Sequence, residues 1–98
     1  MEIIKNVSGE ELTLNVSGRL DTNTAPLLDA EIKEIGVEIK KLVLDFEGLE
    51  YISSAGLRTV LMAQKKMNKQ GVMLVKNVNE SVMEVFQITG FSDILVIE

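Results

Sequence analysis

The first part of the chain alternates apolar and polar residues, the period-2 pattern of a strand with one face in water. This pattern covers residues 11–17 (ELTLNVS). A shorter candidate strand covers residues 3–7, and Ser8, Gly9 and Glu10 between the two have the chemistry of a tight turn. The sequence therefore predicts an amino-terminal β-hairpin.

Three later segments have apolar residues at the helical spacing of three and four, which predicts helices over about residues 24–35, 55–68 and 80–89. Thr24 and Asn79 are the expected N-caps, and the expected helix stops are Gly36, Gly71 and Gly90. The residues expected to face inward are Ala25, Leu28, Ile32 and Ile35, then Leu57, Val60, Leu61 and Gln64, and finally Val82, Val85 and Phe86. On the second helix the expected outward residues are Arg58, Thr59, Met62, Lys65, Lys66 and Lys69.

Short apolar runs at residues 41–46 and 72–75 are typical of strands buried on both faces, as in a parallel sheet. Residues 94–97 predict a last strand, and the residues between the strand at 41–46 and Ser53 predict a short loop. The resulting order, ββαβαβαβ, predicts an α/β fold. We expect one domain over residues 1–98, with a mixed, mostly parallel β-sheet that includes the amino-terminal hairpin and is packed by helices.

The chain has 98 residues, of which 46% are hydrophobic, enough for one compact core. Its net charge of -5 argues against a nucleic-acid partner, and the cluster of Lys65, Lys66 and Lys69 is explained by the dipole at a helix end. Residues 1–6 lack the features of a signal peptide, and no apolar run approaches the ~20 residues that cross a bilayer. We expect a soluble cytoplasmic protein without a membrane partner.

The chain contains no Cys and no His, so thiolate nucleophiles, zinc-thiolate sites and the commonest general base are absent. A carboxylate pair could come from Asp21, Asp45, Glu47 and Glu50, but without a phosphate-binding glycine loop nothing completes a catalytic site. We expect no enzymatic activity, no cofactor and no metal.

The most informative segment covers residues 44–58, which leave a buried strand and enter a helix through Ser53 and Ser54. One serine hydroxyl can cap this helix. The start of a helix also tolerates an anion, because its N–H groups are free and its dipole end is positive. Gly56 in the first turn is expected to leave the serine side chains uncovered and to let a partner approach closely.

In these features the sequence resembles the bacterial anti-sigma factor antagonists of the STAS family, over essentially its whole length. The resemblance is carried by GRLD at residues 18–21 with Thr24 and Ala25, LVLDF at 42–46, ISSAGL at 52–57, and VF at 85–86 with GF at 90–91. Each motif alone is a weak pattern, whereas their order and spacing together are specific.

The resemblance implies that the protein binds an anti-sigma factor, usually an ATP-dependent serine kinase, and so frees a sigma factor. The kinase phosphorylates one serine at the start of the second helix, which abolishes binding, and a PP2C-type phosphatase removes the phosphate. By motif the acceptor is Ser54. Ser53 stands where many members have Asp, so a second acceptor is present. The expected partner contacts are Asp21, Thr24, Ser53, Gly56, Arg58 and Met62.

A second interpretation also involves a STAS domain. Relatives occur at the ends of anion transporters and inside large stress-signalling assemblies, so the chain could be an interaction module that phosphorylation does not regulate. Mapping of the phosphorylated residue after capture of a partner separates the two.

Overall fold

The computed structural model describes all 98 residues as a sheet with helices packed on it. The strands are β1 (Glu2–Ser8), β2 (Glu11–Leu20), β3 (Lys41–Asp45), β4 (Leu49–Ile52) and β5 (Val72–Lys76). The helices are α1 (Ala25–Lys33), α2 (Ser54–Asn68) and α3 (Glu80–Thr89), followed by a short 3-10 helix at Phe91–Asp93. The α/β fold and the hairpin predicted from the sequence are confirmed.

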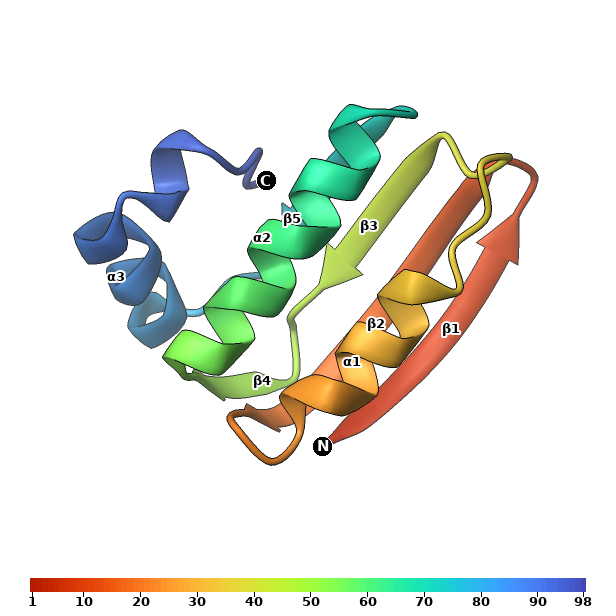
Figure 1. The fold of residues 1–98 in the computed structure, drawn as a ribbon. Helices are drawn as coiled ribbons and strands as arrows, with labels where there is room; N and C mark the ends of the chain where they lie inside the picture. The colour runs from red at the N-terminus through yellow and green to blue at the C-terminus, as the bar shows by residue number, and fades with distance from the viewer.

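The sheet has the order β1-β2-β3-β5, and β4 pairs with the far end of β2. β1 is antiparallel to β2, and the other pairings are parallel. Helices α1 and α2 lie side by side across one face of the sheet, and α3 lies beyond α2 near the C-terminus (Figure 1). One cluster of 23 buried residues fills the space between the sheet and the helices.

The alternation in β2 places Leu12, Leu14 and Val16 in this core. Val43 of β3 points to the opposite face of the sheet, where no helix covers it, yet it is only 4% exposed. In the register it lies between Thr13 of β2 and Leu74 of β5.

Two elements differ from the predictions. The residues after β3 form β4, where a loop was expected. β4 pairs with only three residues of β2, and the pairing is irregular between Gly18 and Arg19. The predicted last strand is wrong: residues 94–97 make a single bridge, Val75 to Ile97. Ile94 and Val96 in this segment are half-exposed, 50% and 57%, so their apolar character did not indicate a strand buried in the sheet.

The helix ends follow the predictions in part. Asn79 caps α3 by accepting a hydrogen bond from the Val82 N–H at 2.8 Å, and Gly90 ends this helix with φ +81°. The side chain of Thr24 makes no capping bond to α1, because its hydroxyl is used inside the preceding loop. α1 ends at Lys33 with Glu34 as its C-cap, before the expected stop at Gly36.

Gly71 follows α2 for a steric reason. A Cβ atom at this position would collide with the carbonyl group of Lys40, which lies in the turn before β3. The N–H of Val72 donates to the same carbonyl oxygen at 2.9 Å. The end of α2 and the start of β3 therefore approach each other at a point that has no room for a side chain.

We expect Gly71→Ala to lower the free energy of unfolding by about 1–3 kcal/mol, because the backbone on both sides must shift. Gly36→Ala is the matched control, since the new methyl group would meet only the mobile carboxylate end of Glu38. Denaturation in urea should show a much larger loss for Gly71→Ala than for Gly36→Ala. Equal losses would contradict the steric role of Gly71.

Candidate partner-binding site

The end of β2 and the start of α2 are held together by one backbone hydrogen bond. Strands β2 and β4 run parallel, and the N–H of Ser53, directly after β4, donates to the carbonyl oxygen of Leu20 at 2.9 Å. The loop at residues 21–24 leaves β2 at this same point and leads into α1. The structure therefore brings Asp21 and Thr24 to the end of the molecule where Ser53 and Ser54 begin α2.

The two serines have different surroundings. Ser53 is the N-cap of α2 and accepts a hydrogen bond from the Gly56 N–H at 3.3 Å, and its side chain is partly buried. Ser54 is the first residue of the helix, is exposed, and makes no side-chain hydrogen bond. The capping role thus belongs to Ser53, and the hydroxyl of Ser54 is free to react with an external group.

The loop after β2 is held rigid by Asp21 and Thr24. One carboxylate oxygen of Asp21 accepts hydrogen bonds from the N–H groups of Asn23 at 3.0 Å and Thr24 at 3.1 Å. The hydroxyl of Thr24 accepts from the Asp21 N–H at 2.9 Å and donates to the Arg19 carbonyl at 2.7 Å. Both side chains are therefore turned largely toward their own loop.

The pKa of the Asp21 carboxyl lies below its ordinary value of 3.8. Desolvation raises this pKa, but the hydrogen bonds from Thr24 and Asn23, together with the nearby Arg19 guanidinium, lower it by more. The ionised carboxylate is thus the form that holds the loop in place.

Gly56 has a different role from the expected one. It is buried, and a Cβ atom here would lie 2.8 Å from the side chains of Ile52 and Leu20 and 2.9 Å from the Leu20 carbonyl oxygen. The missing side chain lets α2 pack against the ends of β2 and β4. The expectation that Gly56 gives a partner close access to the serines is contradicted, because its open side faces the interior.

The outward face of α2 is narrower than predicted. Thr59 is only 3% exposed and donates a hydrogen bond to the carboxylate of Asp29 on α1 at 2.6 Å. Met62 is partly buried and packs against the core, whereas the sequence predicted an outward residue. Arg58 is exposed as expected. The presence of α1 beside α2 explains the corrections at Thr59 and Met62. Leu61, which was expected to face inward, is only partly buried, does not belong to the core and lines a groove at the surface.

Two residues at this end were not singled out from the sequence. The guanidinium of Arg19 lies over the ring of Tyr51, 4.1 Å from its centroid, and the two residues are partners in the β2–β4 pairing. Tyr51 is the only tyrosine of the chain and remains 41% exposed. The sequence predicts a loop in place of β4, so nothing in it places these two side chains together.

The region around the start of α2 has the features of an exposed binding surface. No cluster of three or more acidic residues is placed to hold a metal ion, and no helix is long and apolar enough to cross a membrane. No side chain of the chain is hydrogen-bonded to the Ser54 hydroxyl.

Comparison with known proteins gives a consistent result. The whole chain, residues 1–98, matches the family model of the STAS domain. BtrV of Bordetella bronchiseptica, whose name describes it provisionally as an anti-sigma factor antagonist, is 37% identical over 81 residues, which cover 81% of this chain and 70% of BtrV. The anti-sigma-B factor antagonist of Bacillus subtilis is 28% identical over 86 residues, covering 87% and 79% of the two chains.

Solved structures show the same fold. An anti-sigma factor antagonist from Mycobacterium paratuberculosis superposes with a TM-score of 0.88 at 22% identity, over 98% of this chain and 83% of that one. The Bacillus antagonist SpoIIAA, solved in unphosphorylated and phosphorylated forms, gives TM-scores of 0.78 and 0.77 at 20% identity, over 99% of this chain and 87% and 91% of the two SpoIIAA chains.

The division of roles between the serines can be tested by stability measurements. Ser53→Ala should lower the free energy of unfolding by ~1 kcal/mol, because it removes the cap of α2. Ser54→Ala should leave it nearly unchanged, since this hydroxyl makes no bond and alanine is a good helix former. Urea denaturation of the two variants measures the difference. A larger loss of unfolding free energy for Ser54→Ala would show that Ser54, and not Ser53, is the cap.

The role of the Asp21 carboxylate predicts a pH-dependent stability. Because its pKa is lowered in the folded protein, its contribution is fully present above the ordinary pKa of 3.8 and is lost as the pH falls through the lower folded-state value. Asp21→Asn keeps an oxygen acceptor but no charge. The variant should therefore be less stable than the parent near neutral pH, and the difference should shrink below about pH 4. A difference that does not change with pH would contradict this role.

Proposed function

The chain belongs to the STAS domain family, with anti-sigma factor antagonists among its relatives, and we propose that it is itself an antagonist switched by phosphorylation of Ser54. In the unphosphorylated form it binds an anti-sigma factor with serine kinase activity and so releases a sigma factor. Phosphorylation by that kinase ends the binding, and a PP2C-type phosphatase restores it. All three steps take place in the cytoplasm.

The observation that carries the proposal is the free hydroxyl of Ser54. It lies exposed at the first residue of α2, while Ser53 alone provides the cap. A kinase can therefore modify Ser54 without removing a bond on which the helix depends. Modification of Ser53 would replace the hydroxyl that accepts the Gly56 N–H, so the geometry favours Ser54 as the acceptor.

A phosphate at this position acts in opposite directions on folding and on binding. It adds a charge of roughly -1.5 to -2 at pH 7. At the start of a helix this charge favours the fold, by ~0.3–1 kcal/mol. In a packed interface the same group must lose its water, which is costly unless a partner group compensates. Phosphorylation should therefore abolish binding while the domain stays folded.

Arg58 connects the phosphate to the rest of the surface. It lies four residues after Ser54, the spacing at which side chains on a helix are neighbours. In the unphosphorylated structure it is exposed and forms no ion pair, since the ion pairs of the chain involve other residues. It is thus available to a partner, whereas a phosphate on Ser54 would draw it away.

Relatives support the proposal in two ways. Two curated relatives are named as anti-sigma factor antagonists. SpoIIAA, which shares the fold, is known in a phosphorylated and an unphosphorylated form, so this fold is compatible with such a modification. The proposed contact region is the surface at the start of α2. It consists of residues of the loop after β2 and of α2 with its cap, namely Asp21, Thr24, Ser53, Arg58 and Met62.

The proposal predicts the outcome of an assay with purified serine-kinase anti-sigma factors from the same organism. One of them should bind the unphosphorylated protein and, with Mg-ATP, add a single phosphate at Ser54. Ser54→Asp should melt at nearly the parent temperature, because Asp also suits the start of a helix, yet should no longer bind. Calorimetry and peptide mapping by mass spectrometry measure these effects.

The control is Ser54→Ala, which should bind like the parent and resist the kinase. Normal binding by Ser54→Asp would contradict the switch, and so would a phosphate found on Ser53. If an anti-sigma factor binds but adds no phosphate, the second interpretation of the sequence, an interaction module without phosphorylation, takes its place.

A further inference from the structure

We propose that the outer side of α2 docks an acidic surface of the anti-sigma factor. This surface, the α2 crest, consists of Arg58, Leu61, Met62, Lys65 and Lys69. The inference rests on the proposed function, because it names the chemistry of the partner at the same site. It extends that site from the start of α2 to the end of the helix.

Charge is distributed unevenly along the chain. Residues 51–76 contain five of the ten basic residues and none of the 15 acidic ones. The helix at the centre of this stretch, α2, therefore has no carboxylate to neutralise its cations. On a protein with a net charge of -5, the crest is therefore a local cluster of positive charge.

The cations of the crest are not used by the fold. Arg58, Lys65 and Lys69 take part in none of the four ion pairs and in no side-chain hydrogen bond of the structure. Lys66 is different, because its ammonium group donates to the carbonyl oxygens of Ile32 at 2.8 Å and Lys33 at 3.3 Å. It holds the end of α1, and we leave it out of the crest for that reason.

The helix dipole does not account for this pattern. Cations near the end of a helix are favourable, which explains Lys65 and Lys69. Arg58 is the fifth residue of α2, beyond the first turn, so the helix dipole does not account for its charge. An unpaired arginine at this place needs another explanation, and an acidic partner supplies one.

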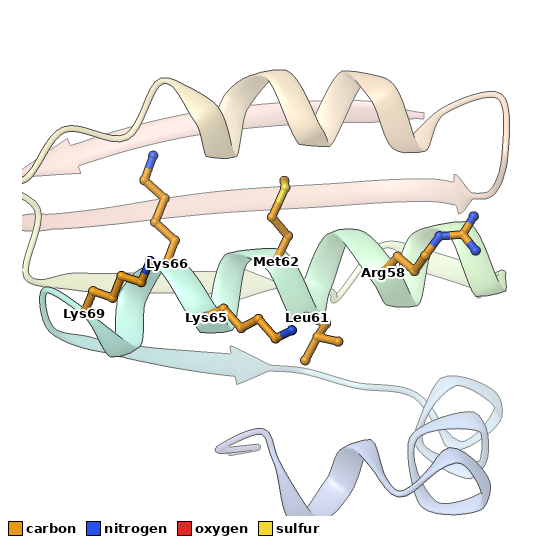
Figure 2. Close-up of a pocket in the computed structure, with 6 residues that line it drawn as sticks. All are labelled: Arg58, Leu61, Met62, Lys65, Lys66 and Lys69. Atoms are coloured by element: carbon orange, nitrogen blue, oxygen red, sulfur yellow. The ribbon is translucent and has the colours of Figure 1, made fainter.

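The crest also has the shape of a binding surface. A groove of about 540 Å³ is lined by its five residues together with Lys66. Figure 2 shows Met62 between the cations, pointing toward α1 like Lys66, while Leu61 and Lys65 lie on the other side of the helix. Apolar side chains flanked by free cations fit a partner with apolar residues at its centre and carboxylates around them.

This groove continues to the switch. A second groove of about 310 Å³ lies between α1 and α2 and shares Arg58 and Met62 with the first. Its lining includes Thr22 of the loop after β2. One continuous surface therefore leads from the loop beside Ser54 to Lys69, and the 15 residues of α2 span about 22 Å. A single partner can cover both ends.

The test uses the anti-sigma factor identified in the binding assay above and the variant Lys65→Gln/Lys69→Gln. Neither lysine lies near Ser54 or holds any other group in place, so the domain should fold like the parent. We expect affinity to fall about tenfold, mainly through slower association, and to depend less on salt. Surface plasmon resonance at several salt concentrations measures both effects.

The matched control is Lys5→Gln/Lys41→Gln, which changes the net charge equally but affects β1 and β3. It removes only two long, exposed ion pairs, with Glu31 and Glu11, and should bind like the parent. If both double variants weaken binding equally, net charge and not the crest is responsible, and the proposal is wrong.

Parent-like affinity and salt dependence of Lys65→Gln/Lys69→Gln would also overturn the acidic-partner proposal, while leaving the antagonist function intact. If no anti-sigma factor binds the parent protein, the proposed function fails, and the crest proposal fails with it. The two failures are therefore distinguishable in one experiment.

Discussion

The close contact between the end of β2 and the first turn of α2 fixes the geometry on which the rest of the structure depends. Ser53 bonds to the Leu20 carbonyl through its backbone, and Gly56 lies against the side chain and the carbonyl of the same residue. No side chain fits between them. Because of this contact, a loop and a helix start that are 30 residues apart in the sequence form one surface.

The same contact shows what the sequence could and could not predict. The hairpin, the buried β3 and β5 and the inward faces of α1 and α3 follow from local periodicity, which depends only on neighbours along the chain. β4 does not, because its four residues pair only with an irregular end of β2. Gly56 illustrates the limit for the site. A glycine in a helix indicates that another group packs closely against the helix, but not which one. At Gly56 the close group is the sheet, through Leu20 and Ile52.

The prediction of which α2 residues face outward was partly wrong for a related reason. A helical wheel assumes one buried side, facing the sheet, whereas α2 also has α1 as a neighbour. Thr59 is buried by this second contact and bonds to Asp29, a residue 30 positions earlier. Met62 is partly covered in the same way. Arg58, Lys65 and Lys69 remain exposed because they lie between the two covered sides, and their position was predicted correctly.

The exposed cations of α2 explain why a single phosphate on Ser54 would have a large effect on partner binding. At an ionic strength near 0.15 M, charges act over about 8 Å, so a partner approaching α2 responds to the crest more than to the net charge of the chain. A phosphate on Ser54 would lie one turn from Arg58, at one end of the cations that attract acidic groups. It would neutralise part of that attraction, repel the partner's carboxylates, and add a group that must be desolvated. The three effects have the same sign for binding, whereas the helix dipole stabilises the phosphate in the folded domain. The fold can therefore remain unchanged while the charge of its binding surface changes sign near Ser54.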